Sequence, residues 1–255
     1  MRWIVALLLL ALPIAVRAAP DTEGLGFESR LGAQIPMGTT LRDERGAPVP
    51  LSAVADGAPL VLALGYFHCP SLCGVVREDA LSALTRAGLR PGTDYRLLVL
   101  GIDPAETPAD AARAKEGALS RYDEAGAEAN WRFLTAPEPA IQAVASAAGF
   151  RFRFDPAIKQ FLHPAGLVVL TGDGVVSSYL MGVGYDPGAL RAAVLQAGMG
   201  SVAQAVSPVL LLCFHYDKQT GRYTLAVTRT LSVLAALTAL TLGGALALAH
   251  ARGRT

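Results

Sequence analysis

Two cysteines four residues apart are the side chains of this sequence best suited to chemistry. Cys69 and Cys73 directly follow the apolar run of residues 60–67, and apolar positions then recur at helical spacing over residues 72–84. The pair therefore lies where a buried strand is expected to turn into a helix. Free backbone N–H groups at a helix start stabilise a thiolate and lower the pKa of a cysteine. With both sulfurs on one helical face, the pair could close a disulfide or chelate one ion. The alternatives are two inert buried cysteines or a plain structural disulfide, although so small a loop gains little chain entropy.

A histidine far along the chain is the third candidate. His163 stands 94 positions after Cys69 (163 − 69), just before the predicted strand 167–170. In the sheet predicted below, that loop packs beside the turn that carries the cysteines. Two thiolates and one imidazole form a soft, low-coordinate site that suits Cu(I) and is compatible with Cu(II). Structural zinc normally takes four protein ligands, and no convincing fourth is present. Taken alone, a loop histidine is more often a solvated or otherwise satisfied side chain.

Several other side chains are weaker candidates. His68 precedes Cys69 and could lower a thiol pKa or donate a ligand, although strand alternation favours its pointing away. Asp103 ends the neighbouring strand, where it either lies next to the ligands or only forms a turn. Cys213 and His215 fall at i and i+2 of a predicted strand, so a second weak metal site or a lone buried cysteine could result. Two thioethers are expected to fill the core: Met181 and Met199.

Strands and helices alternate in the part of the chain that must position these residues. The strands are expected at residues 60–67, 95–102, 131–135, 167–170 and 175–179, and the helices after Cys73, from Thr107, over 137–148 and over 187–197. Continuous apolar runs indicate strands covered on both faces. The order β-α-β-α-β-α-β-β-α predicts an α/β sheet ending in an antiparallel hairpin, which is the arrangement of a thioredoxin-like fold. An N-terminal hairpin near residues 40–51 and a C-terminal β-hairpin extension (209–216 with 223–227) are also expected.

Both ends of the chain carry apolar runs. Residues 1–18 have the basic start, short apolar stretch and small-residue site of a secretory signal peptide, with an uncleaved anchor as the alternative. Residues 230–249 form an uncharged run of 20, which as a helix spans about 30 Å, one bilayer core. A buried helix of a soluble protein is the alternative. The predicted divisions are 1–18 signal peptide, 19–52 N-terminal extension and hairpin, 53–200 thioredoxin-like domain, 201–228 C-terminal extension, 229–250 transmembrane helix and 251–255 cytoplasmic tail.

The composition limits the classes of function. Of 255 residues, 52% are hydrophobic and 17% charged, and 22 Lys+Arg nearly balance 21 Asp+Glu. Such a chain can bury a core, which excludes a disordered protein. It lacks the basic stripe that a nucleic-acid binder presents to phosphates. Three cysteines are too few for a disulfide scaffold.

These motifs together resemble the SCO/SenC family of copper proteins. The resemblance spans residues 31–223 and rests on the Cys69-x-x-x-Cys73 turn, on Gly101-Ile102-Asp103-Pro104 and on the late His163. It is closest to a bacterial subgroup with a C-terminal membrane helix, through Lys159-Gln160-Phe161-Leu162-His163 and Cys213-Phe214-His215-Tyr216-Asp217. The resemblance implies that Cys69, Cys73 and His163 bind copper. It also implies a role in metallating or reducing the dinuclear copper centre of cytochrome c oxidase subunit II.

The chain departs from the family pattern at two positions. Gly74 stands where the family often has Pro, and Leu162 where it often has Asp. The second change removes a side-chain acceptor that would orient the imidazole of His163.

The leading interpretation is a copper metallochaperone held in the bacterial inner membrane by its C-terminal helix, with its domain in the periplasm. Its expected partners are an oxidase copper acceptor, other periplasmic copper chaperones or thiol reductants, and the membrane, but no nucleic acid. The rival is an enzyme, a thiol–disulfide oxidoreductase that uses Cys69 and Cys73 as its redox pair. A non-binding assembly scaffold is the third interpretation.

Overall fold

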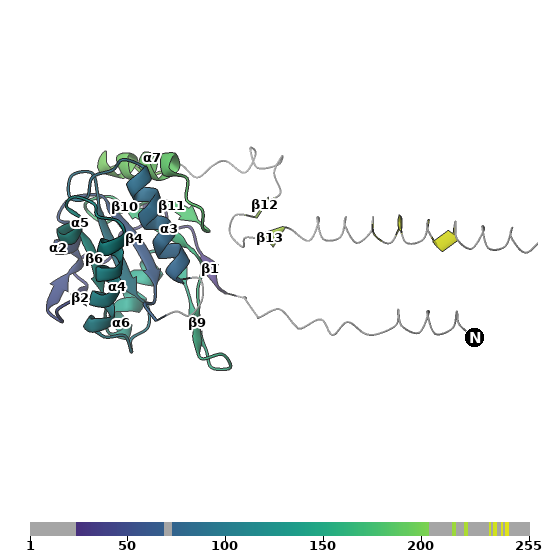
Figure 1. Ribbon diagram of the computed structural model, residues 1–255, viewed down its shortest axis with the longest axis horizontal. Coiled ribbons are helices and arrows are strands. Elements are labelled where there is room, and N and C mark those ends of the chain that lie inside the picture. Colours follow the sequence, from purple (N-terminus) through teal and green to yellow (C-terminus); the bar gives the residue numbers. More distant parts are fainter. Residues whose placement is uncertain are drawn as a thin grey trace, which may run out of the picture.

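Residues 24–68 and 73–203 are described in the computed structural model, with short pieces at 216–217 and 222–223 and single positions between 235 and 244. A five-stranded mixed sheet forms the centre of the molecule (Figure 1). Its spatial order is β11 (Val176–Met181), β10 (Gly166–Leu170), β4 (Leu60–Gly65), β5 (Arg96–Gly101) and β6 (Trp131–Leu134). β4, β5 and β6 are parallel, β10 is antiparallel to β4, and β11 is antiparallel to β10. The sheet order and directions confirm the predicted α/β arrangement, which is consistent with a thioredoxin-like fold.

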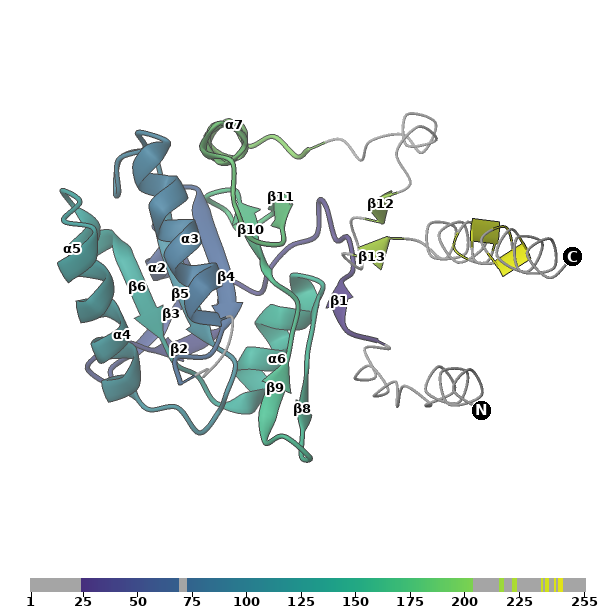
Figure 2. The same ribbon diagram turned by 45° about the vertical axis from the view of Figure 1, so that its right-hand side comes forward.

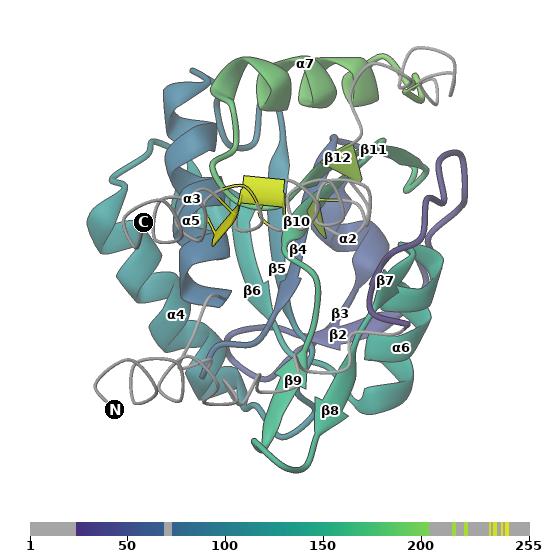
Figure 3. The same ribbon diagram turned by 90° about the vertical axis from the view of Figure 1, so that its right-hand side faces the viewer.

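Helices cover both faces of this sheet. On one face lie α3 (Cys73–Arg86), α4 (Pro108–Arg121) and α7 (Pro187–Gly198), and on the other lie α2 (Leu51–Ala55) and α6 (Glu138–Ala147). Figure 3 shows α3 and α4 on one side of the strands and α6 on the other. The continuous apolar strands supply both cores, because successive side chains of a strand point to opposite faces. In β4, Leu62 and Leu64 pack toward α6, whereas Val61 and Ala63 pack toward α3.

The helix signals in the sequence are confirmed at two ends. Thr107 and Asp110 form a capping box at the start of α4, with Pro108 at its first position. Gly149 follows α6 with a φ of +67°, a conformation that only glycine adopts without strain.

Smaller elements surround the sheet, and the sequence analysis missed most of them. The predicted N-terminal hairpin is present as β2 (Thr40–Arg42) and β3 (Pro48–Pro50), and the C-terminal one is described at β12 (Tyr216–Asp217) and β13 (Arg222–Tyr223). The elements that were not predicted are β1 (Gly26–Phe27), α2, α5 (Ala127–Asn130), β7 (Phe150–Arg151), β8 (Arg153–Asp155) and β9 (Gln160–Leu162). β8 and β9 form a hairpin that projects from the body of the molecule (Figure 2). Strand β1 pairs with β7, which joins the start of the described chain to the segment after α6.

The predicted signal peptide lies outside the described residues, and so does most of the predicted C-terminal membrane helix. Described positions within that run, such as 237, 238 and 241, are helical. Across the part of the chain that the structure describes, no helix combines the length and apolar character needed to cross a bilayer. The domain boundaries given above remain predictions.

Candidate metal centre

The pairing of two strands determines where His163 lies. β10 is antiparallel to β4 with Leu167 opposite Ala63, so the residues just before β10 lie beside those just after β4. His163 precedes β10 and follows β9, and it therefore lies next to the turn that leads into the cysteine motif.

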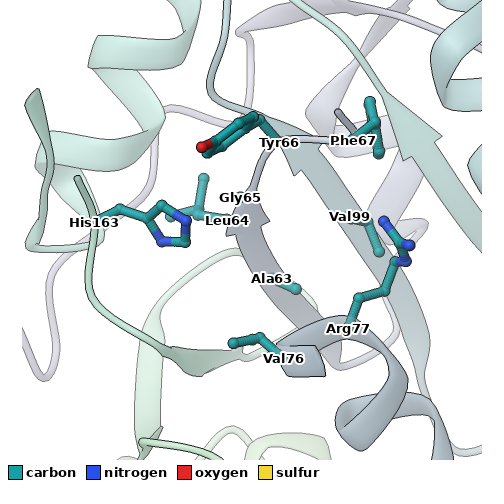
Figure 4. A pocket seen from close by; sticks show the side chains of 9 residues that line it. All are labelled: Ala63, Leu64, Gly65, Tyr66, Phe67, Val76, Arg77, Val99 and His163. Atoms are coloured by element: carbon teal, nitrogen blue, oxygen red, sulfur yellow. The ribbon is translucent and has the colours of Figure 1, made fainter. Parts of the chain in front are cut away.

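A small pocket is lined by His163 and by residues on both sides of that motif (Figure 4). Tyr66 and Phe67, which come just before Cys69 in the chain, line it together with His163. Val76 and Arg77, from the first turns of α3 after Cys73, complete it with residues of β4 and β5. The cavity volume of about 10 Å³ is room for one water-sized species rather than for an organic substrate.

The imidazole of His163 is held on both sides and through one nitrogen. Its ring centroid lies 5.9 Å from that of Tyr66 and 5.8 Å from that of Phe150. Nδ1 is 2.9 Å from the carbonyl oxygen of Pro164. Burial lowers the pKa of His163, so the ring is neutral at pH 7. A neutral imidazole that donates from Nδ1 carries its lone pair on Nε2, which is the form that binds metals.

The two candidate cysteines are described only in part. Cys69 lies outside the described residues, and Cys73 is described as the first residue of α3 but not through its side chain. Among the side chains that the structure describes, no three of His, Cys, Asp or Glu are grouped closely enough to hold a metal ion. The structure therefore brings His163 to the flanks of the motif, and the ligand set Cys69, Cys73 and His163 remains a prediction.

A buried glutamate that the sequence analysis missed lies beneath the same turn. The backbone N–H groups of Phe67 and His68 both donate to Glu106 Oε1, the second at 2.9 Å. The side chain of Glu106 is only 1% exposed, and burial raises its pKa to about 7, with the charges of Asp103 and Asp110 adding to the rise. A signal was available, since Glu106 follows the end of a buried strand, where loops of a parallel sheet converge.

The two weaker candidates near the motif contact this acidic region. His68 Nε2 lies 3.2 Å from Asp110 Oδ1, so its exposed imidazole points toward the start of α4. Hydrogen bonds from the Thr107 side chain and backbone hold the pKa of Asp110 below its usual range. Asp103 Oδ1 accepts the N–H of Ala105, as a turn-forming aspartate does. An influence of His68 or Asp103 on a bound ion remains a prediction.

Arg77 is another residue that the sequence analysis did not single out. It lines the pocket on the side of β4 opposite His163 (Figure 4). Its Nε is buried and has no hydrogen-bond partner among the described residues. Arg77 therefore places a guanidinium group beside the first turn of α3.

The candidates outside this region have mixed outcomes. Cys213 and His215 lie outside the described residues. The expectation that Met181 and Met199 fill the core is wrong, because these residues are 37% and 75% exposed. Met181 ends an edge strand, and Met199 follows the last buried turn of α7, so neither position faces a core.

Comparison with known proteins gives matches at the level of structure. No family model matches the chain, and neither does any curated protein. A candidate electron transfer protein of Aquifex aeolicus VF5 superposes with a TM-score of 0.58 at 26% identity, covering 67% of this chain and 95% of its own. Arabidopsis thaliana ScoI, solved with copper bound, superposes with a TM-score of 0.51 at 16% identity, covering 64% of this chain and 99% of its own. BsSco, described as a member of the Sco family of cytochrome c oxidase assembly proteins with a disulfide switch, superposes with a TM-score of 0.50 at 18% identity, covering 68% of this chain and 97% of its own.

The chain thus has the fold of these SCO proteins. The fold that the sequence resemblance implies is confirmed. The three structures are each covered over nearly their whole length.

Proposed function

We propose that this chain is a SCO/SenC-family protein that binds copper and serves the assembly of cytochrome c oxidase. One observation carries the proposal: His163 shares a pocket with residues on both sides of the CxxxC motif. The neutral, oriented imidazole fits a soft metal ion. The shared fold with a copper-bound SCO protein supports the same conclusion.

In this proposal copper is the cargo, and Cys69, Cys73 and His163 are its ligands. Both thiols lose their protons when they bind the ion, and the start of α3 at Cys73 favours that loss. Three ligands leave an open coordination position. An incoming thiolate of the recipient can therefore bind before a resident ligand leaves, and copper passes on by ligand exchange without a change of oxidation state.

Copper titration of purified full-length chain in detergent tests this assignment. The reduced parent should bind one equivalent, and the Cys69→Ser/Cys73→Ser variant should bind none at that site. Cys213→Ser is the matched control, because it removes the remaining cysteine and should leave the equivalent in place. Full binding by the double variant would show that the ion is held elsewhere.

A second function, thiol–disulfide exchange, is favoured by the position of Cys73 at the first residue of α3. The helix start lowers the pKa of a nearby thiol, which activates it for exchange. The two functions are compatible, because copper can load only when the pair is reduced.

Replacing His163 by Ala separates the two functions. If the chain is a copper donor, His163→Ala should lose Cu(II) binding and oxidase maturation while Cys69 and Cys73 still exchange disulfides with a model dithiol. His250→Ala is the matched control at the far end of the sequence. Unchanged Cu(II) affinity in His163→Ala would leave the oxidoreductase as the better description.

A further inference from the structure

We infer that Glu106 is a positioning residue, whose carboxyl group fixes the backbone of Phe67 and His68 and so the point from which the chain enters the CxxxC motif. The inference rests on the proposed function, and it adds a residue from a separate loop to the site. Glu106 belongs to the connection between β5 and α4, not to the cysteine turn itself.

The hydrogen bonds supply the first argument. Strand β4 ends at Gly65, so the N–H groups of Phe67 and His68 have no strand partner to bond. Both donate to Oε1 of Glu106 instead. A buried N–H without an acceptor destabilises the fold by about 1–3 kcal/mol, so a single carboxyl oxygen stabilises both successive peptide groups.

The space around Glu106 supplies a second, independent argument. A Cβ at Gly101 would lie 2.6 Å from Glu106 Oε2 and 3.1 Å from the ring of Phe67. The carboxyl group and the aromatic ring occupy the space that a side chain at this last residue of β5 would need, and the residue there is a glycine. Oε2 is itself buried and has no hydrogen-bond partner among the described residues.

The hydrogen bonds and the burial of Glu106 fit a role in positioning the backbone better than a role in stabilising the fold. Burial of a carboxyl group whose second oxygen has no partner among the described residues is unfavourable, and an apolar side chain would fill the space without that penalty. An apolar side chain, however, cannot accept hydrogen bonds from both N–H groups and so cannot fix the direction of the turn. Groups that orient ligands from behind typically change metal affinity about 10- to 100-fold when they are removed.

The test compares three full-length variants in detergent with the parent. Glu106→Ala removes the acceptor, Glu106→Gln keeps an acceptor oxygen without the charge, and Glu116→Ala is the matched control on the exposed side of α4. Two properties are measured: copper affinity by competition with a chelator, and the dithiol–disulfide equilibrium in a glutathione buffer. The second measurement needs no copper, so it remains informative if the parent binds none and the proposed function fails.

For Glu106→Ala we expect copper affinity to fall about 10- to 100-fold. We also expect the disulfide equilibrium constant to change by about tenfold, which is about 30 mV. Glu106→Gln and Glu116→Ala should stay close to the parent in both measurements. If Glu106→Ala does not fold, Glu106→Asp, which shortens the reach of the carboxyl group, takes its place with the same expectation.

Two results would overturn the inference. One is a folded Glu106→Ala or Glu106→Asp protein with the copper affinity and disulfide equilibrium of the parent. The other is a Glu106→Gln protein as impaired as Glu106→Ala, since that would assign the effect to charge and not to the hydrogen bonds.

Discussion

At the scale of single residues, a backbone carbonyl supplies the acceptor that the SCO/SenC pattern often provides through a side chain. Leu162 stands where the family often has an aspartate that could orient the imidazole of His163. In the structure, the carbonyl of Pro164 lies 2.9 Å from Nδ1 and supplies that acceptor. A residue-by-residue comparison of motifs cannot show this, because every residue type carries a backbone carbonyl.

The pKa of Glu106 leads to a prediction about stability and pH. Its pKa is raised from 4.5 to about 7 in the folded chain, so its contribution to stability is complete below about pH 4.5. That contribution is lost as the pH rises through 7, because ionisation is disfavoured only in the folded state. A rise of the pKa from 4.5 to about 7 corresponds to about 3 kcal/mol.

Glu106→Gln should therefore gain about 3 kcal/mol in the free energy of unfolding, relative to the parent, on going from pH 4.5 to pH 8. Chemical unfolding at both pH values, followed by the fluorescence of the buried Trp131, measures the difference. Parallel stability curves for the two proteins would show that Glu106 does not ionise in this range.

At the scale of elements, glycines at two helices predict opposite effects of the same substitution. Gly149 follows α6 with a φ of +67°, and a Cβ there would overlap the carbonyl oxygen of Glu28. Gly149→Ala should therefore destabilise the fold by about 2 kcal/mol or more. Gly117, inside α4, has no atom within 4 Å of an added Cβ, so Gly117→Ala should stabilise by about 1 kcal/mol.

Thermal unfolding of both alanine variants checks this pair. Equal effects of the two substitutions would contradict the conformational argument. Copper binding by a folded Gly149→Ala protein is also informative, because Phe150, the next residue, packs its ring beside His163.

The elements also show which parts of the fold could be predicted from the sequence. β4 and β5 were predicted because continuous apolar runs have few other outcomes, and α4 because Thr107, Pro108 and Asp110 form a local start signal. β8 and β9 were missed because their pattern is mixed and their side chains are partly exposed, so periodicity gives no clear signal. Glu106 was missed because its two donors lie 38 and 39 residues away, and only the fold brings them together.

At the scale of the whole molecule, the proposed attachment to a membrane rests on the sequence. Residues 230–249 carry no charge and would span about 30 Å as a helix. We expect the full chain to remain with the membrane fraction in alkaline carbonate, and a chain that ends at residue 228 to be released.

Protease access in intact spheroplasts gives the orientation. The sheet domain should be cleaved from outside, and a tag after Thr255 should be protected. Release of the full chain by carbonate would contradict the tether, and cleavage of the tag would contradict the orientation.

The pairing of β4 with β10 has a consequence for the order of folding events. Cys69 and Cys73 are close along the chain, so they meet without any distant contact. His163 lies 90 residues after Cys73 (163 − 73). It comes beside Tyr66 only when β10 has paired with β4 and so closed a loop of about that length. Closing so long a loop carries an entropic penalty that precedes the contacts between its two ends. For the proposed ligand set, the two thiols can therefore become oxidised in a nascent chain before His163 arrives, and the pair must be reduced again before it binds copper.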